Sequence, residues 1–179
     1  MRRKKRQSRL SHYQQTASGE LIYTGDYQTY VDRGTSRKKL LIELWCLAIA
    51  AGGCLLAGGF LPVESFRGCG YVLLPYMVAL LSTVAVLWYL GELTGGGEPL
   101  KTYIYESTVL RIPRLAVLSA LGAVLCVLGQ AVRCAGNGSC SQAELLFLLL
   151  EAVGALLQLT LRRILRNAQW RKQEKQSDQ

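Results

Sequence analysis

Residues that commonly carry out chemistry are scarce in this chain. Its 179 residues include a single histidine, His12, and charged residues make up only 18% of the sequence. The Cys-x-x-Cys, His-x-Glu and Gly-x-Ser-x-Gly motifs are absent, and so is a phosphate-binding loop. Without a second histidine or a cluster of acids beside it, no acid–base pair can be recognised. We therefore expect no enzyme active site, no bound cofactor and no metal centre.

Long polar segments are also missing from most of the chain. Beyond residue 39, no stretch between or after the apolar blocks is longer than residues 91–114. Segments of that size are too short to enclose a hydrophobic core in water, and the 39-residue N-terminal tail is below the usual limit as well. The lack of such segments predicts a single domain.

What the chain does have is long apolar blocks. Hydrophobic residues make up 50% of the sequence and are grouped rather than spread at a helix or strand period, which is typical of membrane proteins. A helix needs roughly 20 mostly apolar residues to cross a bilayer. We predict an all-α integral membrane protein with a four-helix membrane domain at 40–165, a basic, largely disordered tail at 1–39 and a basic tail at 166–179. The four predicted spans are Leu40–Leu61, Gly70–Leu90, Leu115–Val132 and Ala143–Leu161.

The basic N-terminus resembles the start of a signal peptide only superficially. A cleaved signal has its apolar run directly behind the basic residues. Here polar residues fill the chain from Gln7 to Lys39, apart from scattered apolar side chains. We expect the first span to act as an uncleaved targeting signal.

The basic residues are distributed very unevenly among the loops. Ten Lys or Arg precede the first span and six follow the fourth, while the loop between the second and third spans holds three. The other two loops hold only Arg67 and Arg133. Since Lys and Arg accumulate on the cytoplasmic side, both termini and the middle loop are predicted to be cytoplasmic. In a bacterium this would be the plasma membrane.

The net charge of +9 also bears on partners. A basic tail can bind nucleic acid, but beside four spans the simpler partner is the anionic headgroup surface of the bilayer. We expect lipid contact there and no nucleic-acid binding.

Two short segments outside the spans have patterns of regular structure. Residues Leu21–Val31 are rich in strand-forming residues around a Thr24-Gly25-Asp26 turn signal, which predicts a small cytoplasmic β-hairpin. In the middle loop, Thr102–Leu110 is either a third strand or part of a short interfacial helix spanning Pro99–Ile112. The pattern leaves both alternatives open.

Two cysteines bracket a short glycine-containing loop after the third span. Cys134 and Cys140 are predicted to lie on the non-cytoplasmic side, where a disulfide is stable. Pairing of either one with Cys69, after the first span, is the alternative.

Small residues recur on one face of two spans. These are Ala50, Cys54 and Gly58 in the first span and Ser119, Gly122, Cys126 and Gly129 in the third. Helices in lipid approach closely where side chains are small, so we expect these two faces to make tight contact, within the bundle or between copies.

The fourth span carries a polar stripe. Glu144, Glu151 and Gln158 repeat every seven residues and must face protein or water. Glu151 lies about 12 Å inside the membrane, at a depth similar to Tyr76 of the second span. A charged carboxyl there costs at least about 2.5 kcal/mol, so it should be protonated or paired. At the inner boundary, Glu43 and Arg162 are level and are predicted to form an ion pair.

Two functional hypotheses follow. The first is an accessory or scaffold subunit that binds other membrane proteins or associates with itself. The second is a small oligomeric transporter or channel in which Glu151, with Gln158 and Tyr76, carries a proton or cation.

Overall fold

The computed structural model describes residues 13–15, 21–23, 26–31, 36–63, 68–138 and 140–173. Within these residues, four helices are long and apolar enough to cross a membrane, which confirms the four predicted apolar helices. They are α2 (Arg37–Phe60), α4 (Gly70–Gly95), α6 (Ile112–Asn137) and α7 (Gln142–Asn167). Each helix runs beyond its apolar block, because polar residues next to the block continue the same backbone hydrogen bonds.

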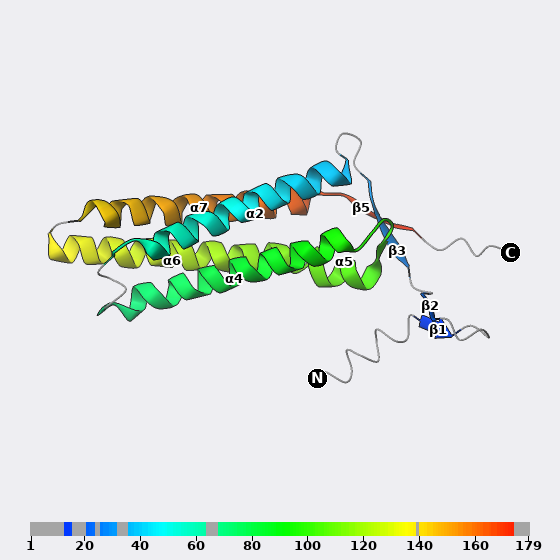
Figure 1. Ribbon diagram of the computed structural model, residues 1–179, viewed down its shortest axis with the longest axis horizontal. Helices are drawn as coiled ribbons and strands as arrows, with labels where there is room; N and C mark the ends of the chain where they lie inside the picture. The colour runs from blue at the N-terminus through cyan, green and yellow to red at the C-terminus, as the bar shows by residue number, and fades with distance from the viewer. Residues whose placement is uncertain are drawn as a thin grey trace.

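The four helices form an up-and-down bundle (Figure 1). α4 and α7 each pack against both α2 and α6, whereas α2 and α6 are diagonal to each other and make little contact. One end of the bundle carries the short helix α5 (Thr102–Thr108) and the strands, and we call it the sheet end. The opposite end, with residues 61–63, 68–69, 138 and 140–141, is called the loop end.

The outer surface of the bundle is apolar. Side chains such as Leu74, Leu81 and Trp88 on α4 are between 63% and 72% exposed, and comparable Leu and Ile residues cover the other helices. A water-soluble protein rarely exposes so large a continuous apolar area. The surface suits lipid, in agreement with the length and composition of the helices.

The small-residue faces make close contacts, but with other partners than expected. A Cβ added to Gly122 of α6 would lie 2.8 Å from the carbonyl oxygen of Pro75 in α4. Gly58 of α2 lies against Phe147 of α7. Within the bundle, the expected contact between the first and third spans is therefore wrong: these helices are diagonal, and Gly122 packs against α4 while Gly58 packs against α7.

A three-stranded sheet covers the sheet end. Strand β3 (Tyr27–Tyr30) pairs antiparallel with β4 (Leu100–Lys101) on one side and β5 (Trp170–Gln173) on the other. Strands β1 (Tyr13–Gln15) and β2 (Leu21–Tyr23) pair separately. The predicted hairpin is wrong in its pairing, because the partner of β3 comes from the C-terminal tail rather than from β2. Of the two alternatives for the middle loop, the helix is present as α5.

Side-chain contacts fix this sheet to the rest of the chain. Lys172 Nζ lies 2.7 Å from Asp26 Oδ2, and the hydroxyl of Thr102 donates to the Asp26 carbonyl at 2.6 Å. The Trp170 ring lies 5.5 Å from the rings of both Tyr30 and Tyr105, with edge-to-face geometry. The N-terminal segment, the middle loop and the C-terminal tail are thus joined at one end of the bundle.

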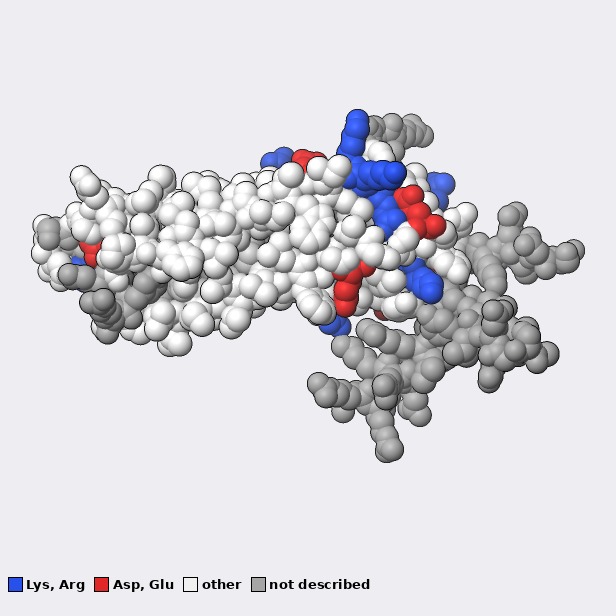
Figure 2. Space-filling view, viewed as in Figure 1, with Lys and Arg blue, Asp and Glu red and all other residues white. Residues whose placement is uncertain are grey.

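The basic residues are concentrated at one end of the bundle. Among the described residues, Arg133 is the only Lys or Arg at the loop end, and the others gather at the sheet end (Figure 2). The uneven distribution of basic residues among the loops is therefore also an uneven distribution in space.

Candidate functional site

The polar stripe of α7 lies inside the bundle. Glu151 is completely buried, Gln158 is 1% exposed and Glu144 is 8% exposed. All three side chains lie on the face of α7 that packs on α2 and α6, because residues seven apart return to the same side of a helix. The interior of the bundle is therefore where polar chemistry is concentrated.

Gln158 belongs to a hydrogen-bonded cluster at mid-bundle. Its Nε2 donates to the hydroxyl of Thr83 at 3.0 Å, and Thr83 and Ser119 share a hydrogen bond of 2.8 Å. The carbonyl oxygen of Ala79 lies 2.9 Å from the Thr83 hydroxyl and 3.1 Å from the Ser119 hydroxyl. Because each hydroxyl has one proton, one of the two donates to Ala79 while the other donates within the pair. The cluster joins α4, α6 and α7, since each helix contributes one side chain. The sequence did not single out Thr83 and did not place Ser119 in a polar network.

Glu151 lies one heptad away and differs from Gln158 in its partners. Neither of its carboxylate oxygens has a hydrogen-bond partner among the described residues. A Cβ added at Gly58 of α2 would lie 3.4 Å from Oε1, so the carboxyl lies directly against the α2 backbone. The absence of a side chain at Gly58 makes room for the acid.

Tyr76 lies nearby, as its depth predicted, but its hydroxyl bonds to the backbone of α2. The hydroxyl donates to the carbonyl of Leu55 in α2 at 3.0 Å. Its oxygen occupies space beside Gly59, where an added Cβ would overlap it. The ring lies 6.3 Å from that of Phe147. Glu151 and Tyr76 therefore meet adjacent glycines of the same helix, although no hydrogen bond between them is formed in the described structure.

The loop end is held by a compact polar cluster. Ser141 caps α7: its backbone N–H donates to Glu144 Oε2 at 2.9 Å and its hydroxyl accepts from the Glu144 N–H at 3.3 Å. Arg133 of α6 forms a 2.9 Å ion pair with the other Glu144 oxygen. Glu144 is thus a structural acid that connects α6 to α7 rather than a free group within the membrane.

Cys134 and Cys140 form a disulfide in this cluster, with their Cα atoms 5.2 Å apart. Cys69 is among the free cysteines, so the alternative pairing is not formed. With Glu144, the two sulfurs make the one group of potential metal ligands close enough to share an ion within the described residues. Disulfide sulfurs are poor ligands compared with thiolates, and Glu144 is engaged by Arg133 and Ser141, so these residues fit a covalent staple better than a metal site.

The disulfide predicts a definite pattern of thiol labelling. In denaturant without reductant, we expect an alkylating reagent to modify the four free cysteines Cys46, Cys54, Cys69 and Cys126, and to modify all six after reduction. Cys134→Ser should release Cys140 and raise the unreduced count from four to five. Intact-protein mass spectrometry measures each count, and six modified cysteines in the unreduced wild type would contradict the pairing.

The predicted ion pair between Glu43 and Arg162 is not formed among the described residues. Glu43 is exposed on the outer side of α2, whereas Arg162 borders a cavity between α6 and α7. The two residues are level along the bundle axis but face in different directions, because depth alone does not set the rotation of a helix.

An open small-residue groove lies on the outside of α2. Cys46, Ala50, Gly53 and Ala57 are all exposed and recur every three or four residues, so they lie along one side of the helix. A Cβ at Gly53 would meet nothing within 4 Å. We call these four residues the α2 groove. The spacing of small residues grouped Ala50 with Cys54 and Gly58, but Gly58 is buried and Cys54 half-buried, so the exposed stripe is rotated from the predicted contact face.

The comparisons with known proteins add no relative: no protein-family model, curated protein sequence or solved structure matches the chain.

Proposed function

We propose that the protein is an accessory subunit of the membrane, inserted with its sheet end in the cytoplasm, and that the α2 groove binds a transmembrane helix of another membrane protein. The orientation is supported by the concentration of Lys and Arg at the sheet end, which follows the positive-inside rule.

The observation that carries the proposal is the α2 groove. Within a bilayer, helices gain little from burying apolar side chains and associate instead where small residues let backbones approach. Gly53 and Ala57, four residues apart, form such a small-xxx-small pair, and both are exposed. Inside the bundle the comparable glycines, Gly58 and Gly122, are filled by neighbouring helices. The α2 groove is a corresponding surface that is left open, as is the shorter pair Gly91 and Gly95 at the end of α4.

The interior supports a binding role more than a chemical one. Gln158, Thr83 and Ser119 are hydrogen-bonded to one another and connect three helices. Glu144 likewise connects α6 to α7 through Arg133. Most of the buried polar groups therefore hold the bundle together, leaving the outer faces and the sheet end to contact partners.

Gly53→Leu tests the α2 groove. We expect the tagged wild type, extracted in a mild detergent, to recover a second integral membrane protein in a fixed ratio. A leucine at Gly53 fills the groove without touching the bundle, so recovery should fall at least about tenfold, corresponding to roughly 1.4 kcal/mol of lost binding. Quantitative mass spectrometry of the eluates measures the ratio.

Gly91→Leu is the matched control, because Gly91 on α4 is also exposed with nothing within 4 Å of its Cβ. It should leave recovery unchanged. Equal losses in the two variants would contradict a site on α2. Recovery of this chain alone, with oxidative cross-linking between copies at exposed Cys46, would replace the accessory role with self-association.

A transporter is the second candidate, favoured by Glu151. An intramembrane acid that is fully buried without a hydrogen-bond partner among the described residues is typical of groups that exchange a proton or cation. Proton-coupled uptake by proteoliposomes that is present in the wild type and lost in Glu151→Gln would establish this role. Uptake unaffected by the substitution would remove its main support.

A further inference from the structure

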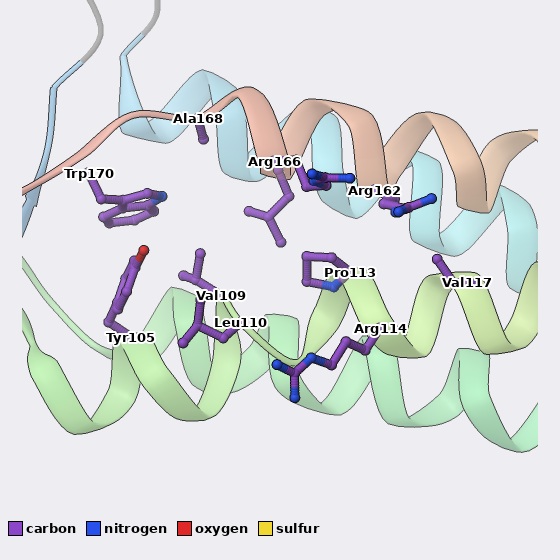
Figure 3. A pocket seen from close by; sticks show the side chains of 11 residues that line it. Tyr105, Val109, Leu110, Pro113, Arg114, Val117, Arg162, Arg166, Ala168 and Trp170 are labelled. Atoms are coloured by element: carbon purple, nitrogen blue, oxygen red, sulfur yellow. The ribbon is translucent and has the colours of Figure 1, made fainter.

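A cavity of about 580 Å³ opens between α6 and α7 at the sheet end (Figure 3). Helix α5 and the residues that follow it form one side, and the C-terminal part of α7 forms the other. Trp170 of β5 and Tyr105 of α5 close it toward the sheet. The cavity therefore lies where the apolar spans give way to the basic end of the bundle.

Its lining combines two kinds of side chain. The apolar part consists of Val109, Leu110, Pro113, Val117 and Leu165. The polar part is dominated by three arginines, Arg114 from α6 and Arg162 and Arg166 from α7. No acidic residue is among the lining residues of the cavity. An occupant would meet an apolar wall and positive charge from two helices at once.

Three other described arginines have side-chain partners, whereas the arginines of the cavity, like the exposed Arg163 and Arg171, have none among the described residues. Arg37 binds the carbonyl of Leu93 and pairs with Glu98, Arg111 donates to the Tyr89 hydroxyl, and Arg133 pairs with Glu144. Arg114, Arg162 and Arg166 form no ion pair or side-chain hydrogen bond with any described residue. Their charge is available to an external anion.

The basic wall extends beyond this cavity. Arg162 and Arg166 also border a neighbouring hollow on α7, together with Arg163 and Leu159. Arginine side chains therefore follow α7 along its last turns, at the depth where lipid phosphates would lie if the helix spans a bilayer. The apolar residues of both hollows lie beside them.

We propose that this cavity is a binding site for an anionic phospholipid of the cytoplasmic leaflet. The phosphate would be held by Arg114 and Arg162 from opposite walls, since a guanidinium group binds phosphate oxygens through two parallel N–H donors. Val117 and Leu165 would contact the upper part of an acyl chain. The inference rests on the membrane orientation given above, and it is independent of the accessory role and of the α2 groove.

The chemistry favours a lipid over a soluble phosphate compound. A free anion needs donors but gains nothing from an apolar wall, whereas a lipid presents an anion and a hydrocarbon chain in a fixed order. The cavity has the matching arrangement, because its arginines and its apolar side chains lie next to each other at the end of the spans. Its volume matches a headgroup and glycerol region rather than a whole lipid.

Trp170 provides a reporter inside the site. The chain has three tryptophans, and Trp45→Phe with Trp88→Phe leaves Trp170 as the sole fluorophore. The full chain with these changes is reconstituted in phosphatidylcholine vesicles containing increasing fractions of phosphatidylglycerol brominated near the glycerol. We expect quenching of Trp170 to saturate at a much lower fraction than with brominated phosphatidylcholine.

Arg114→Gln with Arg162→Gln should shift that saturation at least about tenfold toward higher phosphatidylglycerol fractions, because two charge-assisted contacts are lost. Lys38→Gln with Lys39→Gln is the matched control: it removes the same charge from exposed positions at the same end of the bundle, and it should leave the curve unchanged. If the glutamine pair fails to fold by circular dichroism, Arg114→Lys with Arg162→Lys keeps the charge and should still weaken binding severalfold.

Three results would overturn the site. Equal quenching by the two brominated lipids in the wild-type background would exclude selection of an anionic lipid. A loss in the Lys38 and Lys39 control as large as in the arginine variant would indicate diffuse attraction to the surface. Suppression of the phosphatidylglycerol effect by inorganic phosphate at matched ionic strength would assign the arginines to a soluble anion.

Loss of partner recovery in Gly53→Leu does not affect the quenching measurements. This proposal and the accessory role can therefore fail separately.

Discussion

Gly122→Ala is expected to lower the thermal stability of the bundle markedly, although it adds only a methyl group. The new Cβ would lie 2.8 Å from the Pro75 carbonyl oxygen and 2.9 Å from the Ala79 nitrogen. Both are backbone atoms of α4, so no side-chain rotation can relieve the overlap and the two helices must separate. Overpacking of this kind costs about 1–3 kcal/mol.

Gly91→Ala provides the comparison for this prediction. Gly91 is in α4, exposed, and a Cβ there meets nothing within 4 Å. The substitution should leave stability unchanged or raise it slightly, since alanine is the better helix former. Thermal unfolding in detergent, followed by circular dichroism, should show a lower midpoint for Gly122→Ala by roughly 2–4 °C per kcal/mol. Equal midpoints in the two variants would mean that α4 and α6 are not in contact at Gly122.

The contrast between these glycines marks the limit of what the sequence could predict. Block-wise hydrophobicity is a one-dimensional property, and it was sufficient to predict the four apolar helices. The pattern of small residues predicted that Gly122 would lie at a close contact, but not which helix it meets. Neighbour relations depend on the topology: α6 packs on α4 and α7, the long helices before and after it in the chain, and makes little contact with α2.

The sheet end shows a second limit. The strand-forming pattern of residues 27–30 was visible in the sequence, but the turn signal before it suggested the nearest partner in the chain. The partners in the structure are Leu100–Lys101 and Trp170–Gln173, and the second of these has no alternating pattern of its own. It is brought there by the up-and-down topology, which returns the end of α7 to the start of α2. Pairing between distant segments follows from the assembled bundle and cannot be read from local propensity.

The candidate site was predicted in part for the same reason. Heptad spacing indicated that Glu144, Glu151 and Gln158 share one face, and the structure buries that face. Spacing could not show that Glu144 would be held by Arg133, that Gln158 would find Thr83, or that Glu151 would face the α2 backbone at Gly58. These partners lie on other helices, and their rotation is set by packing.

Glu151→Met is expected to stabilise the bundle, which is unusual for a change at a fully buried residue. Methionine has a similar length and fits the apolar surroundings, while the carboxyl it replaces has no hydrogen-bond partner among the described residues. Removing an unsatisfied buried polar group gains about 1–3 kcal/mol. The unfolding midpoint in detergent should therefore rise above that of the wild type.

Gln158→Met is the matched control, one heptad along the same helix and equally buried. It loses the hydrogen bond to Thr83, and interhelical hydrogen bonds in membrane proteins contribute about 0.6 kcal/mol on average. It also removes Gln158 Oε1, which has no hydrogen-bond partner among the described residues. Its midpoint should therefore rise less than that of Glu151→Met. A midpoint that falls in both variants would show that Glu151 has a stabilising partner in the folded bundle and is part of its architecture.

A rise in Glu151→Met that exceeds the shift in Gln158→Met would have a consequence for function. A residue whose removal stabilises the protein is not retained for folding, so Glu151 would then have to serve an activity that requires an acid at that depth. Uptake by proteoliposomes carrying Glu151→Met, and partner recovery with the same variant, separate the two remaining roles. If Glu151→Met loses uptake but still recovers the partner protein, the result favours a transporter. If the wild type shows no uptake and Glu151→Met no longer recovers the partner protein, the result favours a Glu151 carboxyl that binds the partner.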